Sequence, residues 1–383
     1  GEGWWHLRRQ RADVLAPVLL KMEGCTNVVV MNVRFINSPF YHIVSISCSR
    51  LLLEGLFIQA PLDSKNTDGV NLLNSTHVVV RRSTVDTGDD NCAVKEGTRR
   101  VLIDHCNFRN GHGSSIGSLG EGGSFGEVRD IVMRNIVFNA TVNAVRIKTW
   151  QGGRGAVTNI TYEDLVLVDV TCPLLIDQFY CASSQHPSKC QNSTEAVQVS
   201  SITFQRVRGT QTSSAVGQFL CSDARPCKDI HLEDIYVKPT KRRDGLEAHM
   251  GKTRPWWLRP KGTPTNTFKC WNAKGTATNV EPPACLNENS IGHGVVSTGI
   301  LSRGMSIGLT TSDKWESVVT EKRKRRAEQA ESAKQREDYE KRVAKKEAAT
   351  TTSASCTPFS HDQVGCKDGV FTKPEANVYP HQR

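Results

Sequence analysis

The sequence lacks several features that mark common functional classes. No stretch approaches the run of about 18 apolar residues that a membrane-spanning helix needs, so we expect no membrane association. The 13 cysteines form no CxxC pair and no paired histidines follow them, which argues against a zinc site. The glycine-rich segment 117–123 lacks GxGxxG spacing and a P-loop lysine, which excludes a nucleotide-binding loop. We therefore expect no metal and no cofactor.

The net charge of +10 does not belong to the main part of the chain. Residues 241–383 hold 25 basic against 16 acidic side chains, whereas residues 1–240 hold 24 against 23. A nucleic-acid-binding surface would require a basic excess on the folded domain itself, so we expect no nucleic-acid partner. A basic C-terminal arm that binds polyanions stays open as an alternative.

Cysteines at short spacings indicate loop-closing disulfides in an oxidising compartment. The sequence leaves the connectivity open, but the closely spaced pairs are Cys181/Cys190, Cys221/Cys227, Cys270/Cys285 and Cys356/Cys366. Asn-x-Ser/Thr glycosylation sequons occur at Asn74, Asn139, Asn159 and Asn192. Both features predict a secreted protein, and we expect it to be a monomer.

A short pattern recurs through the first 240 residues: a polar residue, a run rich in Val, Ile and Leu, then a second short apolar alternation. Its copies begin at Asn27, Arg50, His77, Arg100, Asp130, Asn159, Ser201 and Asp229, with intervals of 23 to 30 residues and one of 42. Short strands of this kind bury their apolar faces only by stacking coil on coil. No LxxLxL frame and no helical period accompany them. The sequence therefore predicts an all-β fold, a parallel β-helix (solenoid).

Coil length also predicts the placement of further cysteines. Cys25 and Cys48 are 23 residues apart, so they should stack in adjacent coils, either as a disulfide or as buried free thiols. The 42-residue interval contains Cys181 and Cys190, and we expect an inserted loop closed by their disulfide.

The repeat fades after Thr240, and four parts of the chain are predicted. Residues 1–286 form the β-helix domain, and the part from 241 to 290 supplies a last coil or cap. An irregular extension follows at 287–320. Residues 321–348 are highly charged and have no apolar seam, which predicts a helical or disordered tail segment. Residues 349–383 form a cysteine-containing tail.

Candidate catalytic residues occur at one-coil intervals. The segments are Asn66-Thr67-Asp68-Gly69, Gly88-Asp89-Asp90, Gly111-His112-Gly113 and, further on, Arg146-Ile147-Lys148. Steps of 21 to 23 residues place equivalent positions on neighbouring rungs, about 4.8 Å apart. Asp68, Asp89 or Asp90, and His112 should therefore line one face of the solenoid.

Strand alternation places Arg146 and Lys148 on one side, with Ile147 in the core. Glycosidic hydrolysis needs one protonated carboxyl to protonate the leaving oxygen and one carboxylate to activate water. Closely spaced carboxylates raise one pKa, which keeps one of them protonated. The two cations would bind the carboxylate of an acidic sugar. Taken singly, each aspartate is an ordinary turn residue, but the adjacent Asp89-Asp90 pair costs stability unless it has a use.

These four segments, with Ser115-Ile116-Gly117-Ser118 after His112, resemble in order and spacing the signature motifs of the polygalacturonases, glycoside hydrolase family 28. The resemblance covers roughly residues 1–286. It implies a right-handed parallel β-helix in the extracellular space or cell wall. It also implies hydrolysis of α-1,4 links between the galacturonates of pectin, with inversion and without a cofactor.

The resemblance also implies residue roles. Asp89 would be the general acid, Asp68 and Asp90 would activate the attacking water, and His112 would tune the acid. The residues implied in substrate binding are Arg146, Lys148, Asn66 and Tyr180.

Some questions stay open. Asn91 separates the paired aspartates from Cys92, which leaves a Cys92–Cys106 bridge undecided. Relatives place coils before a segment like Gly1-Glu2-Gly3-Trp4-Trp5, so we expect the first coils to be missing. Exo and endo action are both compatible with the motifs. The alternatives are a hydrolase of rhamnogalacturonan or other decorated pectin, and a non-catalytic β-helix that binds acidic polysaccharide.

Overall fold

The structure is a computed structural model, and it describes residues 1–286 apart from residues 12, 181–193, 214 and 241–265. The predicted segments 287–320, 321–348 and 349–383 lie outside the described residues, so the domain boundaries stay predictions. The cysteines outside this part of the chain include Cys181, Cys190, Cys356 and Cys366.

One parallel sheet runs along the described chain and supplies one strand to each coil. Its order of paired strands is β1 (Leu20–Glu23), β4 (Ile43–Ile46), β7 (Val70–Leu73), β10 (Cys92–Val94), β13 (Ser114–Leu119), β15 (Val145–Trp150), β17 (Leu174–Tyr180), β19 (Ala215–Leu220) and β21 (Thr267–Trp271). We call it sheet A.

The second sheet, sheet B, begins as two rows of short strands. One row is β2 (Thr26–Met31), β5 (Ser49–Glu54), β8 (Thr76–Arg81) and β11 (Arg99–Asp104); the other is β3 (Arg34–Ile36), β6 (Phe57–Gln59), β9 (Thr84–Asp86) and β12 (Asn107–Arg109). Both rows meet at β14 (Phe125–Asn139), which pairs with β11 and with β12. Long strands continue the sheet: β16 (Arg154–Val170), β18 (Gln198–Gln211), β20 (Cys227–Pro239) and β22 (Ala273–Glu281).

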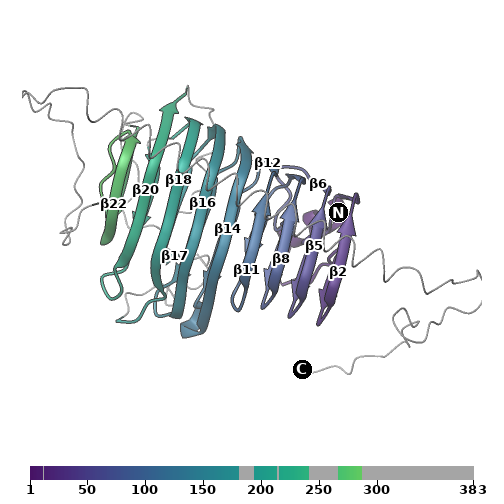
Figure 1. Cartoon of the computed structure of the whole chain (residues 1–383). Helices are drawn as coiled ribbons and strands as arrows, with labels where there is room; N and C mark the ends of the chain where they lie inside the picture. The colour runs from purple at the N-terminus through teal and green to yellow at the C-terminus, as the bar shows by residue number, and fades with distance from the viewer. Residues whose placement is uncertain (12, 181–193, 214, 241–265, 287–383) are drawn as a thin grey trace, which may run out of the picture. The chain divides into compact units, whose positions relative to one another are not determined.

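The architecture is the predicted right-handed parallel β-helix, and Figure 1 shows the strands of sheet B side by side in chain order. Strands β21 and β22 pair with β19 and β20 and make the predicted last coil. The helix α1 (Glu2–Gln10) and the short 3₁₀ helix η1 (Glu121–Gly123) were not predicted from the sequence. No helix in the described ranges is long and apolar enough to cross a membrane.

The polar residue that opens each repeat has a left-handed backbone. All eight of these residues have φ between 55° and 59°. Register shows the consequence: Thr26 pairs with Ser49 and Val28 with Leu51, while the left-handed residue between them has no partner in the ladder. A β-branched residue would be strained at this φ, whereas Asn and Asp tolerate it. This explains why each apolar run is preceded by a polar residue.

Inward-facing aromatic side chains from both sheets pack against one another in the interior. The rings of Tyr162, Phe204, Phe219 and Phe268 form a continuous column, with successive centroids 5.1, 5.7 and 5.9 Å apart. All four side chains are buried. Each buried side chain of this size contributes about 1.5–3 kcal/mol of transfer free energy, so the column stabilises the packing of the two sheets and of neighbouring coils.

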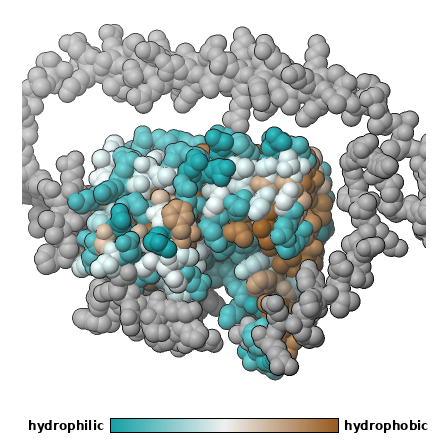
Figure 2. Space-filling model, turned by 90° about the horizontal axis from the view of Figure 1, so that it is seen from below, coloured by the Kyte–Doolittle hydropathy of each residue, from teal (hydrophilic) through white to brown (hydrophobic). Residues whose placement is uncertain are grey.

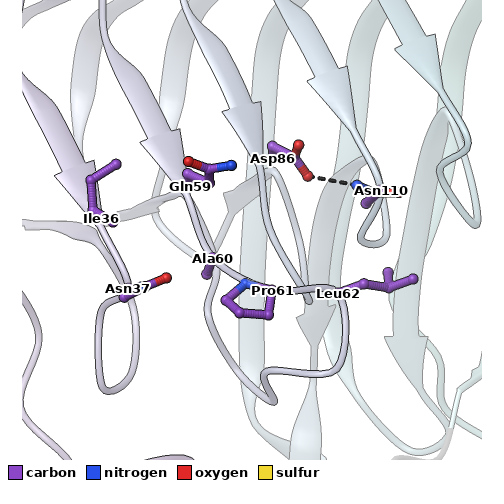
Figure 3. Close-up of a pocket in the computed structure, with 8 residues that line it drawn as sticks. All are labelled: Ile36, Asn37, Gln59, Ala60, Pro61, Leu62, Asp86 and Asn110. Atoms are coloured by element: carbon purple, nitrogen blue, oxygen red, sulfur yellow. Dashed lines mark hydrogen bonds between the residues drawn. The ribbon is translucent and has the colours of Figure 1, made fainter. Parts of the chain in front are cut away.

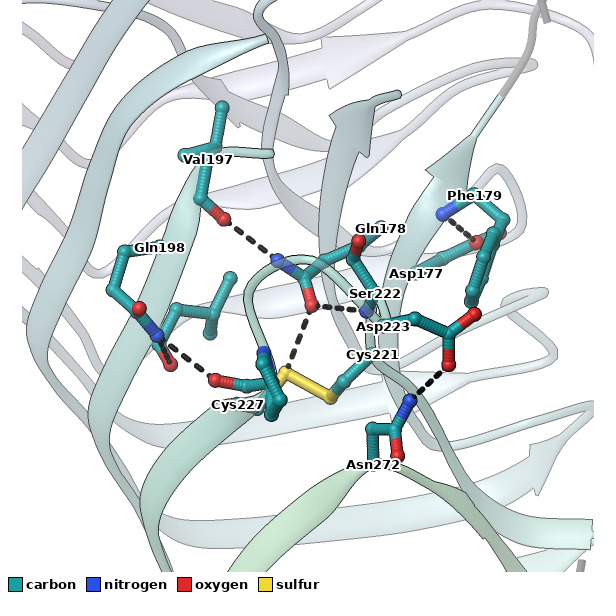
Figure 4. Close-up of a disulfide and its surroundings, with 12 residues drawn as sticks. Asp177, Gln178, Phe179, Val197, Gln198, Cys221, Ser222, Asp223, Cys227 and Asn272 are labelled. Carbon is teal, nitrogen blue, oxygen red and sulfur yellow. Dashed lines mark hydrogen bonds between the residues drawn. A yellow bond between two sulfur atoms is a disulfide. The ribbon is translucent and has the colours of Figure 1, made fainter. Parts of the chain in front are cut away.

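Two of the closely spaced cysteine pairs form disulfides, Cys221–Cys227 and Cys270–Cys285. Figure 4 shows the first of them, where Gln178 accepts a 2.7 Å hydrogen bond from the backbone of Ser222 and donates one of 2.6 Å to Val197. Gln178 thereby connects β17 to the disulfide loop.

Four further cysteines are free thiols. Cys25 and Cys48 do stack in adjacent coils, where the Cys25 amide donates to the Cys48 sulfur at 3.4 Å. Cys92 and Cys106 are buried without a bridge, so the bridge left open by the sequence does not form here.

The first coil carries several outward-facing apolar side chains. Val29, Met31, Val33 and Ile36 are all exposed. Hydrophobic residues gather toward this end of the solenoid on the face seen in Figure 2.

Phe138 tests the packing of the core. Its side chain is fully buried and meets Phe108 edge to face, with ring centroids 5.6 Å apart. We expect Phe138→Ala to lower the free energy of unfolding by about 3–5 kcal/mol, because it leaves a cavity in a packed interior. Phe125→Ala, on the same strand but at a side chain that is 66% exposed, should change it little. Denaturant unfolding of both variants measures the difference, and equal losses would contradict the packing account.

Candidate active site

Sheet A brings the predicted catalytic segments together at the start of three adjacent strands. Val70, Cys92 and Ser114 are in register on β7, β10 and β13. The residues two positions earlier are therefore equivalent, and these are Asp68, Asp90 and His112. The sequence left open whether Asp89 or Asp90 takes the middle rung, and the register assigns it to Asp90.

Asp89 is held by its neighbours on both sides. His112 Nδ1 lies 2.9 Å from Asp89 Oδ1, and the backbone amide of Asp90 donates to the same oxygen at 2.9 Å. Asn66 donates to Asp89 Oδ2 through its backbone amide at 3.3 Å and its side-chain amide at 3.4 Å. Burial alone would raise the pKa of Asp89, but attraction to His112 outweighs it, and the pKa lies below its usual value.

Asp90 is the charged centre of the site. Arg146 donates to Oδ1 at 2.6 Å, Ser115 to the same oxygen at 2.7 Å, and Lys148 to Oδ2 at 3.0 Å. Only 3% of the Asp90 side chain is exposed. Burial raises its pKa, yet Arg146 and Lys148 more than offset this and hold the pKa well below its usual range. Asp90 is therefore ionised, and Ile147 points into the core as predicted.

Asp68 has the opposite environment. Its residue is buried, and no hydrogen bond or ion pair links its carboxyl to another side chain in the described part of the chain. Burial, together with the charges of Asp89 and Asp90, raises its pKa well above the usual value. The backbone of Asp68 is fixed by His42, whose amide nitrogen donates to the Asp68 carbonyl at 2.8 Å. His42 Nδ1 also lies 3.1 Å from that carbonyl.

Tyr180 lies beside the cations of this cluster. The Lys148 ammonium lies 5.4 Å from the centre of its ring, and the ring meets Trp150 edge to face at 6.0 Å. Burial raises the pKa of Tyr180, so its hydroxyl stays protonated as a hydrogen-bond donor.

Sequence reasoning gave no role to three residues that build this site. Ser115 bridges Asp90 and Arg146, and its position in the Ser-Ile-Gly-Ser segment was the available signal. Lys95 donates to the Gly117 carbonyl at 2.8 Å and adds a third cation near the aspartates. Asn91 is fully buried; its amide donates to the carbonyl oxygens of Val85 and Arg109, and its oxygen accepts from Gly113. Asn91, which separates the paired aspartates from Cys92, therefore has a structural role: it links three backbone segments by hydrogen bonds.

The glycines around His112 are required by close backbone contacts. Gly111 and Gly113 have φ of 56° and 77°. A Cβ at Gly113 would lie 2.0 Å from the Asn143 carbonyl oxygen, and one at Gly111 would lie 2.2 Å from the Asp89 carbonyl oxygen. Any side chain here would push the His112 loop away from Asp89.

The carboxylates also have the spacing of a metal site. Ligand atoms of Asp89, Asp90 and His112 all lie within 4.8 Å of one another. Arg146 and Lys148 already neutralise Asp90, so a divalent cation would be placed against two positive side chains. The absence of a metal stays a prediction.

A pocket of about 420 Å³ lies outside this cluster (Figure 3). It is lined by Ile36, Asn37, Gln59, Ala60, Pro61, Leu62, Asp86 and Asn110. Asn110 donates to the Asp86 carboxylate at 2.7 Å. Its lining holds no cation, so it does not suit an acidic sugar, and the acidic cluster is the better candidate for the active site.

Known sequences include a family and relatives that this chain resembles. The sequence model described as glycosyl hydrolases family 28 matches residues 1–250. The chain belongs to that family. A probable polygalacturonase of Arabidopsis thaliana is 35% identical over 317 residues, which cover 82% of this chain and 64% of the relative. A polygalacturonase of Cryptomeria japonica is 38% identical over 247 residues, covering 63% of this chain and 48% of the relative.

Solved structures share the fold of this family 28 chain. An endo-xylogalacturonan hydrolase from Aspergillus tubingensis matches with a TM-score of 0.60 at 21% identity, over 73% of this chain and 72% of that one. A polygalacturonase from Erwinia carotovora matches at 0.56 and 24% identity, over 72% and 64%. The chain spans about half to two thirds of the length of the curated relatives it matches.

The two rung aspartates of this family 28 site should affect stability in opposite directions. The folded-state pKa of Asp68 lies above the unfolded value of about 3.9, so its ionisation opposes folding at higher pH. We expect Asp68→Asn to raise the thermal unfolding midpoint at pH 8, and the gain to shrink as the pH falls toward 4.

Asp90→Asn should do the reverse. Its pKa is depressed on folding, so its contribution is present above the unfolded value and is lost as the pH falls through the folded value. Leaving Arg146 and Lys148 unpaired should cost about 3–5 kcal/mol at pH 7. Calorimetry at several pH values measures both variants, and destabilisation by Asp68→Asn at pH 8 would refute the assignment.

Proposed function

We propose that this chain is a polygalacturonase that hydrolyses α-1,4-galacturonosidic bonds of polygalacturonate with inversion, acting as a secreted monomer in the extracellular space or cell wall. One observation carries the proposal. Asp90 is ionised and bound by Arg146 and Lys148, and next to it Asp89 is hydrogen-bonded to His112. The names of the Arabidopsis and Cryptomeria relatives support the same substrate.

Asp89 is the proposed general acid. Its Oδ1 lies 2.9 Å from His112 Nδ1, and this contact holds the carboxyl in place. In its protonated form, Asp89 can deliver its proton to the leaving glycosidic oxygen.

Asp90 is the proposed base of the water-activating pair. Burial and the neighbouring charges raise the pKa of Asp68, whereas Arg146 and Lys148 lower that of Asp90, so we take Asp90 as the ionised member. The attacking water gives its proton to Asp90 as its oxygen bonds to the anomeric carbon, and the leaving oxygen takes its proton from Asp89.

Substrate binding would strengthen that base. Arg146 and Lys148 lower the pKa of Asp90 in the free site, which makes it a weak proton acceptor. A galacturonate carboxylate that engages the same two cations shares their charge, and the pKa of Asp90 then rises toward a useful range. The acidic sugar thereby strengthens the base that activates the attacking water. A neutral sugar would leave Asp90 fully neutralised by its cations, which favours polygalacturonate over a neutral substrate.

Asp89→Asn tests the acid. We expect kcat on polygalacturonate to fall by about 10²–10⁴-fold, the usual contribution of a general acid. Release of reducing ends measures it, and chromatography of the products separates exo action, which gives monomer, from endo action, which gives a range of lengths.

The control for that test is Asp63→Asn, since the Asp63 side chain is 84% exposed and lies 3.8 Å from Arg9. It should leave kcat near the wild-type value. Binding of polygalacturonate by a folded wild type without release of reducing ends would refute hydrolysis and favour a non-catalytic binder. Unsaturated products would indicate a lyase.

Lys148→Met tests recognition of the substrate carboxylate. Loss of one charged hydrogen bond should lower kcat/KM on polygalacturonate by about 10–100-fold. Activity on methyl-esterified pectin, which lacks the charge, should fall less. Lys21→Met is the matched control, because Lys21 is half-exposed and pairs with Glu23 on the first coil. Equal losses of kcat/KM on both substrates would show that Lys148 does not recognise the substrate carboxylate.

A further inference from the structure

Helix α1 brings a cation to the catalytic loops from the N-terminal end of the described chain. Trp5 anchors the helix: its side chain is buried and its indole nitrogen donates to the Ser38 carbonyl at 3.0 Å. One turn further on, the Arg8 guanidinium lies 4.3 Å above the centre of the Phe40 ring. Its NH2 group donates to Asn66 Oδ1 at 3.2 Å. Helix α1 thus contacts Asn66, which lies 58 residues after Arg8 in the sequence and itself donates to Asp89.

The two ends of the Asn66 amide have different partners. Its oxygen accepts from Arg8, and its nitrogen donates to Asp89 Oδ2 at 3.4 Å. If the amide flipped, its oxygen would face the Asp89 carboxylate and its nitrogen would face the guanidinium, and both contacts would become repulsive. Arg8 therefore selects the orientation in which Asn66 is a donor to Asp89.

We propose that Arg8 is a positioning residue for the catalytic acid, acting through Asn66 to hold and orient the Asp89 carboxyl. The inference rests on the proposed function, because it takes Asp89 as the proton donor. It assigns to helix α1 a part in the active site that none of the sequence motifs indicates.

The surroundings of Arg8 agree with a positioning role. Its Nε and NH1 atoms are buried and have no hydrogen-bond partner among the described residues. A buried guanidinium with unpaired donors opposes folding, so packing on Phe40 alone is a poor reason for arginine at this position. The next residue shows the contrast: Arg9 is half-exposed and forms only the long ion pair with Asp63.

Removing the guanidinium should change catalysis in a specific way. Without Arg8 the Asn66 amide is free to rotate, and Asp89 loses a donor that stabilises its ionised form. The pKa of Asp89 should rise, since hydrogen bonds to the charged form are what lower it. The basic limb of the pH–rate profile, which reports the acid, should then move to higher pH. Because Arg8 acts through Asn66 rather than on the sugar, KM should change little while kcat falls.

The experiment compares Arg8→Leu with Arg9→Leu, in the full chain and at physiological salt. Leucine keeps an apolar contact with Phe40 and removes the same charge at both positions. We expect Arg8→Leu to lower kcat by about 10-fold or more, as small displacements of catalytic groups do, and to shift the basic limb upward. Arg9→Leu should match the wild type, and Arg8→Lys should recover part of kcat.

Coupling to Asn66 separates positioning from a structural effect. In an Asn66→Ala background, Arg8→Leu should produce no further loss of kcat, because the two residues act in series. Full additivity, or equal kinetics for Arg8→Leu and Arg9→Leu, would overturn the proposal. If Arg8→Leu does not fold, as judged by circular dichroism, Arg8→Gln carries the same expectations.

A measurement without turnover distinguishes this inference from the proposed function. NMR titration of the Asp89 carboxyl should show a higher pKa in Arg8→Leu than in the wild type and in Arg9→Leu. An inactive wild type would count against the polygalacturonase proposal, while an unchanged Asp89 pKa in Arg8→Leu would count against the positioning role.

Discussion

The backbone hydrogen bonds between adjacent coils are the constraint on which the site depends. They hold Val70, Cys92 and Ser114 in register, and the residues two positions earlier are thereby placed side by side although they are 22 residues apart in sequence. On sheet B, a left-handed residue recurs near the start of each apolar run, at equivalent positions of successive coils. Side chains stacked at equivalent positions of adjacent coils, such as Tyr162 on Phe204, make slippage of one coil against the next costly. Catalytic geometry is thus a consequence of how the solenoid stacks.

Within that frame, charge is distributed so that neighbouring carboxyls differ. Arg146 and Lys148 hold the pKa of Asp90 well below its usual range, and His112 keeps that of Asp89 below its usual value. Asp68 has no side-chain donor among the described residues, and burial raises its pKa well above the usual value. Burial raises the pKa of all three aspartates. At Asp89 and Asp90, nearby charged groups outweigh burial and lower the pKa. A site arranged for stability alone would not leave the Asp68 carboxyl without partners, and this cost is typical of a functional site. The same asymmetry separates the acid from the base in the proposed reaction.

The sequence predicted the fold and much of the site, because in a repeat protein the spacing of two residues along the chain tells which coil and which face each occupies. The fold, the face shared by Asp68, Asp90 and His112, and the inward direction of Ile147 all follow from coil length and strand alternation. Helix α1 was missed because its nine residues carry no strong apolar stripe, and its docking depends on Trp5 meeting a loop more than 30 residues away. The structural role of Asn91 was missed for a similar reason. Its three hydrogen bonds join segments that spacing alone does not connect.

By itself the sequence determined the solenoid, the rung on which each motif lies and the chemistry these residues bring, because a periodic chain has only one way to stack its apolar runs. Only the tertiary structure decided which carboxyl has a raised pKa and which a lowered one, since that depends on burial and, for Asp90, on cations two coils away. It also decided that a helix at the start of the described chain reaches Asn66. Both outcomes rest on contacts between segments whose separation is not a multiple of the repeat, and such contacts leave no periodic trace in the sequence.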